Sequence, residues 1–167
     1  KNNKIIIQFY YLINPQRDIT AEATRINNIT NEIVSDAPLS SEVLPYIIDF
    51  IGGGCIVWHN ICFDLIFLAY ELALTGRKLK NTTPAIDTVK MSKRLLPHLS
   101  SHRLSSIASY LGVCNKQMHR AMPDVELTIS VLKHLINIAE EHHINRFYKL
   151  HKEFGVTKPS FKIELEE

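Results

Sequence analysis

The chain has no run of hydrophobic residues long enough to span a membrane, and no segment with the pattern of a signal peptide. Its longest apolar stretch, residues 5–13, is interrupted by Gln8 and ends in a turn at Asn14 and Pro15. The stretch is rich in β-branched and aromatic residues, which predicts a strand. These absences favour a cytoplasmic protein without a membrane partner.

Cysteine is also scarce: the chain has three, Cys55, Cys62 and Cys114, with no CxxC spacing. An odd number in this arrangement argues against a disulfide framework, so we expect reduced thiols. No strongly basic block is present either. The net charge of +2 therefore permits nucleic-acid binding without indicating it.

The size and composition are those of one globular domain. A chain of 167 residues can bury a core, and its 46% hydrophobic and 22% charged residues are ordinary proportions for such a domain. No internal repeat divides the sequence. We expect one domain over residues 1–155, followed by a C-terminal tail over residues 156–167.

Strand patterns come early in the chain and helical patterns come late, which predicts an α/β domain with one central sheet. A second, buried strand is expected at residues 55–58, directly after three glycines.

Residues 16–40 are rich in loop signals, with Thr30 as a possible helix start. Pro45 should confine the regular part of its helix to the later turns. Helices are predicted over residues 42–51, 63–75, 87–96, 104–111, 123–141 and 144–154. The expected buried face of the 123–141 helix consists of Val125, Ile129, Leu132, Ile136 and Ala139.

Two short segments, His59–Asp64 and His119–Asp124, each end in a carboxylate at the start of a predicted helix. Pro123 suits the first position of the second of these helices. The helix dipole favours an acid in a first turn whether or not the acid has a function. Neither segment alone therefore identifies a site.

Taken together, the two segments favour metal-assisted hydrolysis. Asp64 would follow the carboxyl end of a buried strand, where ligands bind in α/β folds. Mg²⁺ prefers a few carboxylates combined with substrate phosphates, and a histidine that titrates near neutrality can accept a proton from an attacking water. This combination suits phosphodiester hydrolysis assisted by Mg²⁺ or Mn²⁺.

In order and spacing, the segments closely resemble the second and third motifs of the DEDDh exonucleases. These are 3′–5′ exonucleases related to the epsilon proofreading subunit of bacterial DNA polymerase III. The second motif of that family reads His-Asn-x-x-Phe-Asp, and the third reads His, four residues, then Asp. Similar segments at residues 12–15, 26–30, 86–88 and 102–104 extend the likeness over about residues 4–135. The resemblance implies a ribonuclease H-like fold, a five-stranded mixed sheet flanked by helices.

By this resemblance, Asp64 and Asp124 are metal-site carboxylates, and His119 is the base that deprotonates the attacking water. Asn60 would brace the site or contact the nucleic acid near its 3′ end, although capping the helix is an equal alternative. His59 would support the motif structurally. The implied reaction releases nucleoside 5′-monophosphates from single-stranded DNA 3′ ends, with two Mg²⁺ or Mn²⁺ ions in the complete family site.

The sequence departs from the family in its first motif, an Asp-x-Glu on the central strand. The first acids of the chain, Asp18 and Glu22, lie on the wrong element and at the wrong spacing to replace it. Asp87 is interpreted as a helix-start acid without a catalytic role. We therefore expect either a longer natural protein or a gap filled by another segment, a partner chain or a second copy in a homodimer. Two carboxylates could hold one metal ion weakly, whereas a two-metal site needs more ligands.

Two alternatives keep the same fold. One is a non-catalytic nucleic-acid-binding or polymerase-associated module, which the missing acids favour and the retained His119 and Asp124 oppose. The other is an exoribonuclease, since only the closeness to the proofreading branch favours DNA over RNA.

Other chemistry-bearing residues receive structural interpretations. A metal site at His98 and His102 is not expected, because no carboxylate or cysteine is placed to complete a ligand set. Aromatic residues can stack on nucleic-acid bases where they are exposed, but Tyr10, Trp58 and Phe63 are interpreted here as core residues.

Overall fold

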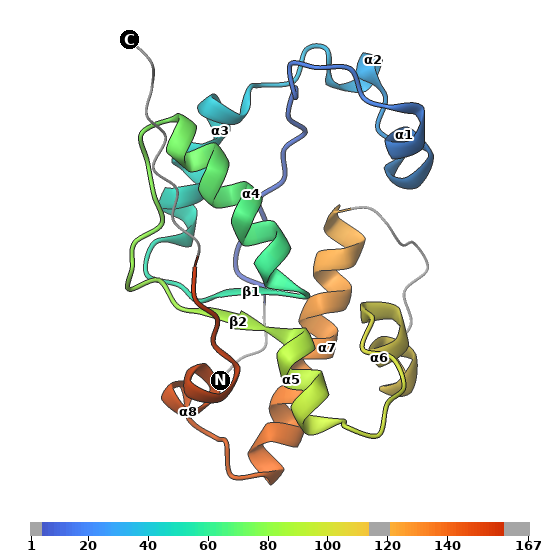
Figure 1. Cartoon of the computed structure of the whole chain (residues 1–167), viewed down its shortest axis with the longest axis vertical. Helices are drawn as coiled ribbons and strands as arrows, with labels where there is room; N and C mark the ends of the chain where they lie inside the picture. Colours follow the sequence, from blue (N-terminus) through green and yellow to red (C-terminus); the bar gives the residue numbers. More distant parts are fainter. Residues whose placement is uncertain (1–4, 114–120, 159–167) are drawn as a thin grey trace.

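The computed structural model describes residues 5–113 and 121–158, and within these residues a parallel pair of strands has helices on both faces (Figure 1). Strand β1 (Ile56–Trp58) pairs with β2 (Ala85–Asp87). Helix α4 (Ile61–Leu74) follows β1, and helix α5 (Thr88–Leu95) follows β2. Because the strands are parallel, both helices begin at the same edge of the sheet. The predicted α/β class is confirmed, but within the described residues the sheet has two parallel strands and not the five-stranded mixed arrangement that the resemblance implied.

Alternating side chains of the two strands enter two separate apolar clusters. Ile56 and Ala85 pack with Leu65 of α4 on one face. Val57 and Ile86 point to the larger cluster on the other face. Successive residues of a strand point to opposite faces, so three residues per strand are enough to anchor helices on both sides.

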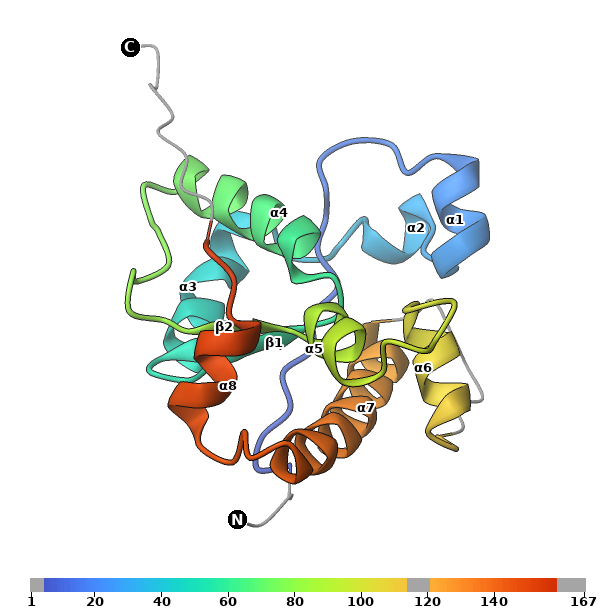
Figure 2. The same cartoon turned by 60° about the horizontal axis from the view of Figure 1, so that its bottom comes forward.

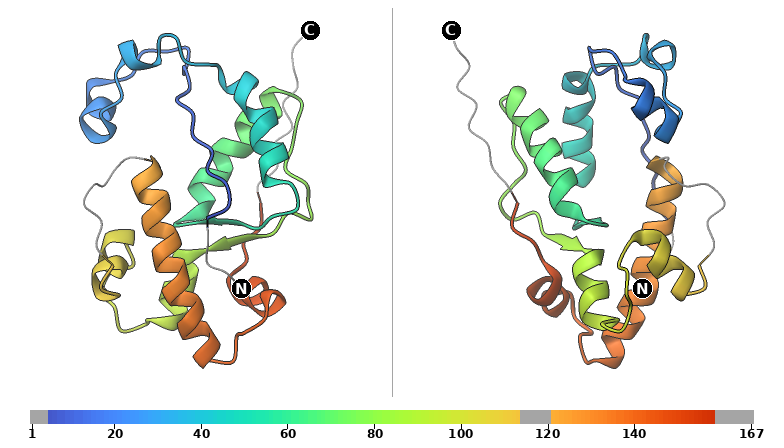
Figure 3. Two further views of the ribbon diagram at one scale, coloured as in Figure 1. Left: turned by 180° about the vertical axis from the view of Figure 1, so that it is seen from behind. Right: turned by 45° about the vertical axis from the view of Figure 1, so that its right-hand side comes forward.

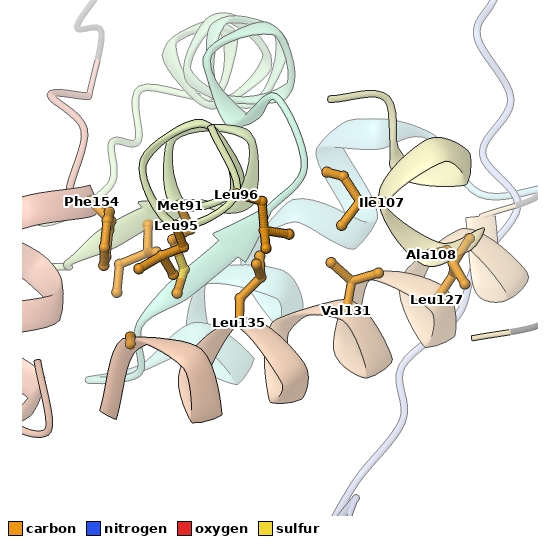
Figure 4. Packing of buried hydrophobic residues seen from close by; sticks show 11 residues of the cluster. Met91, Leu95, Leu96, Ile107, Ala108, Leu127, Val131, Leu135 and Phe154 are labelled. Carbon is orange, nitrogen blue, oxygen red and sulfur yellow. The ribbon is translucent and has the colours of Figure 1, made fainter. Parts of the chain in front are cut away.

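Helix α7 (Ala121–Glu141) contributes several residues to the larger cluster, where it packs against α5 and α6 (Leu104–Tyr110) (Figures 2 and 4). Val131 and Leu135 of α7 have no exposed surface. Their neighbours across the interface are equally buried or nearly so: Met91, Leu95, Leu96, Ile107 and Ala108.

Helix α3 (Ser40–Ile51) runs through Pro45 without interruption, so the expectation that Pro45 would confine its regular part to the later turns is wrong. The missing N–H of one proline removes a single helical hydrogen bond. The start of the helix is supported instead by Glu42, whose carboxylate accepts a 2.7 Å hydrogen bond from the backbone N–H of Leu39. The helix ends at Ile51, as predicted, and Gly52 follows it with φ of 48°.

Residues 16–40 hold two short helices, α1 (Ala21–Asn27) and α2 (Asn31–Val34). The hydroxyl of Thr30 accepts a 3.3 Å hydrogen bond from the N–H of Ile33, which confirms Thr30 as a helix start. Helix α1 was not predicted. None of its residues is buried, so it lacks the apolar stripe from which sequence analysis identifies helices.

The predicted strand at residues 5–13 is not formed, and this expectation is wrong. The segment crosses the molecule as an extended chain beside the sheet (Figure 3). Ile6 and Ile7 are 89% and 66% exposed. Beyond the segment, Asn14 forms one isolated bridge with Leu39. Residues with high β-propensity favour a strand only where they can pack on a half-buried pleated sheet. Among the described residues, no neighbouring strand is available to this segment.

The buried face of α7 is also rotated from its prediction. Val125 is 42% exposed, whereas Val131 and Leu135 are fully buried. Ala139 is buried as predicted. The other predicted residues, Ile129, Leu132 and Ile136, line an open groove of about 580 Å³ with Ile5, Ile6, Ile7, Phe50 and Lys133. Helix α7 therefore carries apolar side chains on two faces.

Helix α8 (Phe147–Phe154) begins at Phe147 rather than at the predicted residue 144, and Phe154 is fully buried. After it, Gly155 bridges to Ile86 of β2, and the N–H of Val156 donates a 3.0 Å hydrogen bond to the carbonyl of Ala85. The division between a domain at 1–155 and a tail at 156–167 stays a prediction.

The expectations about the cysteines and about membrane-spanning segments can be compared with the described residues. Cys55 and Cys62 are free thiols, as expected, whereas Cys114 lies outside the described residues. Within residues 5–113 and 121–158, every helix is too short or too polar to cross a bilayer.

We expect Leu135→Ala to lower the free energy of unfolding by about 2–5 kcal/mol, because it opens a cavity in the larger cluster. Leu132→Ala removes the same atoms from the groove face of the same helix and should cost clearly less. Urea denaturation of both variants measures the difference. An equal or larger loss for Leu132→Ala would contradict the assignment of the buried face.

Candidate active site

Asp64 lies in the first turn of α4, directly beyond the carboxyl end of β1. The turn is made by Asn60, which adopts a left-handed conformation with φ of 65° and ψ of 47°. The Asp64 side chain is half-buried, and this burial raises its pKa above the usual range for an aspartate. A hydrogen bond from the Asp64 backbone partly offsets this rise in pKa, and the negative charge of Asp87 adds to it. A nearby cation would favour the ionised carboxylate.

Asn60 is exposed, and its side chain makes no hydrogen bond to the start of α4. The alternative that the Asn60 side chain caps the helix is therefore wrong. Its backbone is tied down instead, because the N–H of Asn60 donates a 3.0 Å hydrogen bond to Oδ1 of Asp87. The amide side chain is left accessible to solvent. Its contact with substrate stays a prediction.

Asp87 caps α5, as its interpretation as a helix-start acid predicted: Oδ1 accepts a 2.8 Å hydrogen bond from the N–H of Val89. What the sequence did not reveal is that the same oxygen also binds the turn before α4. The only local signal was Asp87-Thr88 at a helix start, a pattern that explains the cap without the second bond.

A second set of hydrogen bonds joins the same two turns. Thr88 is fully buried, and its hydroxyl lies 2.9 Å from Nδ1 of His59 and donates to the carbonyl of Trp58 at 3.2 Å. Burial lowers the pKa of His59, and the negative charge of Asp87 partly offsets this effect. His59 thus has structural contacts, which is the role that the family resemblance implied.

Asp124 lies in the first turn of α7, directly after Pro123. The helix begins at Ala121, two residues before the position predicted from Pro123. The Asp124 side chain is partly exposed, and its backbone carbonyl accepts a 2.8 Å hydrogen bond from the hydroxyl of Thr128. His119, the predicted base, lies outside the described residues.

The two predicted metal-site carboxylates thus both project from first turns of helices. Helix α4 begins where β1 ends, and the N-terminal half of α7 passes beside that end of the strand (Figures 1 and 3). Carboxylates in small number are the protein ligands that Mg²⁺ prefers, so the residue types fit one ion completed by water and phosphate oxygens. Within residues 5–113 and 121–158, no three His, Cys, Asp or Glu side chains gather into a complete metal site.

The excluded histidine site has clear structural contacts. Nδ1 of His102 lies 3.0 Å from the hydroxyl of Ser92, which is fully buried. The ring of His98 packs edge-on against Tyr110, with 5.2 Å between ring centroids. Neither histidine is directed at a shared ligand position by these contacts.

A pocket of about 880 Å³ lies next to the start of α7. The first residues of this helix, which directly precede Asp124, line part of it. Its walls come from the extended N-terminal segment, from α1 and α2, and from the first residues of α7. Tyr10, Tyr11 and Arg17 are among the lining residues. Two of the segments that resemble the exonuclease family, residues 12–15 and 26–30, also contribute to the walls.

Two of the three aromatic residues interpreted as core are largely exposed. Tyr10 is 56% exposed and Phe63 is 61% exposed, so the core interpretation is wrong for both. Phe63 precedes Asp64 and stacks obliquely on Phe67, with 4.9 Å between ring centroids. Trp58 is half-buried and packs against the smaller cluster, which agrees with its interpretation.

Comparison with known proteins places this geometry in a family. The exonuclease family model RNase_T matches residues 1–132. The DNA polymerase III PolC-type protein of Clostridium perfringens is 34% identical over 133 residues, which cover 80% of this chain and 9% of that protein. The DNA polymerase III subunit epsilon of Rickettsia felis is 34% identical over 136 residues, covering 77% of this chain and 59% of the subunit.

A solved structure shares the fold. The structure of "Exonuclease X in complex with 5′ overhanging duplex DNA" superposes with a TM-score of 0.69 at 23% identity, over 91% of this chain and 84% of that one. This likeness supports the ribonuclease H-like fold. The chain spans about a tenth of the PolC-type relatives and 59% of the epsilon subunit from Rickettsia felis. By the match over residues 1–132, the chain is a member of the exonuclease family.

Proposed function

We propose that the chain forms part of a metal-dependent 3′–5′ exonuclease site that releases nucleoside 5′-monophosphates from single-stranded DNA ends. The observation that carries the proposal is the placement of Asp64 in the first turn of the helix that follows β1, together with Asp124 in the first turn of α7. Ligands bind outside the carboxyl ends of the strands in open α/β sheets. Both residues lie within the part that matches the exonuclease family.

In the proposed site, Asp64 and Asp124 are the residues that would hold a divalent cation, Mg²⁺ or Mn²⁺. When bound, the cation would stabilise negative charge on the phosphate oxygens. The raised pKa of Asp64 fits this role, because burial and the Asp87 charge make the ionised carboxylate costly until a cation arrives. His119 accepts the proton of the attacking water.

The pocket beside α7 supports a nucleic-acid substrate. Its volume of about 880 Å³ is in the range of small-molecule sites. Tyr10 and Tyr11 can stack on bases, and Arg17 can bind a phosphate. We propose that the terminal nucleotide enters this pocket, with Asn60 contacting the nucleic acid near its 3′ end.

The partners follow from the relatives. Two kinds of relative are DNA polymerase III components by name, and the structural neighbour was solved with duplex DNA. We propose association with a DNA polymerase in addition to nucleic acid. Strand complementation by a partner chain or homodimerisation stays a prediction from the sequence.

Mn²⁺ titration of the chain tests the metal site directly. We expect Asp64→Asn and Asp124→Asn each to weaken Mn²⁺ binding about tenfold or more, because each removes a ligand. Glu71→Gln, on the same helix as Asp64, is the control and should bind as the unchanged chain does. If Asp124→Asn unfolds the protein instead, Asp124 has a structural role.

Release of a 3′-terminal label in the presence of Mn²⁺ tests the reaction. His119→Ala should lower turnover by about 10²–10⁴-fold with little change in substrate binding, the usual contribution of a general base. Parallel single-stranded DNA and RNA substrates decide between the deoxyribonuclease and exoribonuclease alternatives. Binding of nucleic acid with no release from either substrate would favour the non-catalytic module.

Asp64→Asn should raise the melting temperature of the metal-free protein at pH 7. The folded state raises the pKa of Asp64, so as pH increases the unfolded chain loses this proton first. Stability therefore falls between the two pKa values, and the ionised carboxylate is destabilising above them. The gain should shrink as pH is lowered in thermal unfolding experiments. A lower melting temperature for the variant would mean that the acid stabilises the helix start through the dipole.

A further inference from the structure

We propose that Asp87 is a positioning residue: by holding the backbone of the Asn60 turn, its carboxylate sets the place of Asp64 at the metal site. The inference rests on the proposed function, since it concerns how that site is built. Its basis is a single carboxylate oxygen, Oδ1, that accepts hydrogen bonds from two helix starts. One comes from the N–H of Asn60 at 3.0 Å and the other from the N–H of Val89 at 2.8 Å.

The two bonds join elements that are far apart in the chain. Asn60 ends the turn between β1 and α4, whereas Asp87 ends β2 and caps α5. The strand register places them side by side, because Trp58 is paired with Asp87. Asp87 is 8% exposed, and hydrogen bonds at such a site are stronger than those exposed to water.

The conformation of Asn60 makes the bond to its N–H important for Asp64. Left-handed backbone is disfavoured for most residues with a Cβ, although Asn adopts it more readily than others, and contacts help to hold it. Asn60 precedes the first turn of α4, and Asp64 lies in that turn. A change in the Asn60 backbone would therefore redirect the helix start and displace the carboxylate of Asp64.

Capping alone does not require this arrangement. Helices α1 and α2 of the same chain are capped by Thr20 and Thr30, each hydroxyl accepting one bond from its own helix, at 3.2 and 3.3 Å. In contrast, Oδ1 of Asp87 accepts one hydrogen bond from its own helix, α5, and one from the residue before α4. The buried Thr88 hydroxyl adds a parallel hydrogen bond to the carbonyl of Trp58, whereas the N–H of Asn60 donates to Asp87.

Two neutral substitutions separate positioning from capping. Asp87→Asn keeps an oxygen at the position of Oδ1 and can accept both bonds. Asp87→Ser can cap α5, but its hydroxyl is one bond shorter and cannot also reach Asn60. Both variants lack the negative charge, so any effect of that charge on Mn²⁺ is common to the two.

We expect the Asp87→Ser chain to bind Mn²⁺ about tenfold more weakly than the Asp87→Asn chain, as for other groups that orient metal ligands. Amide hydrogen exchange of Asn60, followed by NMR, should be faster in Asp87→Ser than in Asp87→Asn, while their melting temperatures stay similar. Equal Mn²⁺ affinities and equal Asn60 exchange would overturn the inference. If the unchanged chain binds no Mn²⁺, the proposed function fails, and Asn60 exchange alone decides whether Asp87 holds the turn.

Discussion

The parallel pairing of three residues in β1 with three in β2 is the constraint on which the rest of the structure depends. It sends α4 and α5 off from one edge of the sheet and brings Trp58 opposite Asp87. Both strands contribute side chains to one apolar cluster on one face of the sheet and to a second apolar cluster on the other face. A ladder this short cannot be held by its own hydrogen bonds, since isolated strand pairs are marginal in water. The packed helices and the polar ties at its carboxyl end must hold it.

The hydrogen bonds at the carboxyl end of the strands lie at the same place as an acid whose ionisation is unfavourable and which belongs to the proposed metal site. Asp87 and Asp64 are close enough that the charge of one raises the pKa of the other. The ionised carboxylate of Asp64 therefore opposes folding in the absence of a cation, whereas the negative charge of the two acids attracts a cation. Thr88 and His59 secure the same turn through a hydroxyl and an imidazole, whereas Asp87 is held by the backbone N–H groups of Asn60 and Val89.

Local sequence patterns predicted the helices well where apolar periodicity and capping agree. The helices beginning at Thr88 and Leu104 are examples. The prediction failed where the outcome depends on distant partners. Residues 5–13 have strong strand propensity, but a strand requires a neighbour that local sequence does not reveal. The rotation of α7 has a similar origin, because Ile129 and Val131 are equally apolar and tertiary contacts decide which is buried.

The acids of the candidate site were identified by motif spacing and fold position, since Asp64 and Asp124 both stand in first turns as expected. Spacing did not reveal the link between Asp87 and Asn60, because a hydrogen bond between residues 27 positions apart depends on strand register. Nor did it reveal the pocket walls. Tyr10 looked like a core residue because its neighbours are apolar, whereas the folded segment leaves it exposed.

The groove between the N-terminal segment and α7 has a calorimetric consequence. Ile6 and Ile7 are mostly exposed in the folded protein, and they line this groove together with Leu132. Apolar surface that is hydrated before unfolding contributes nothing to the heat-capacity change of unfolding, which arises from newly exposed surface. The stability curve of this chain is therefore flatter than that of an equally long protein with a closed core, and its stability varies less with temperature.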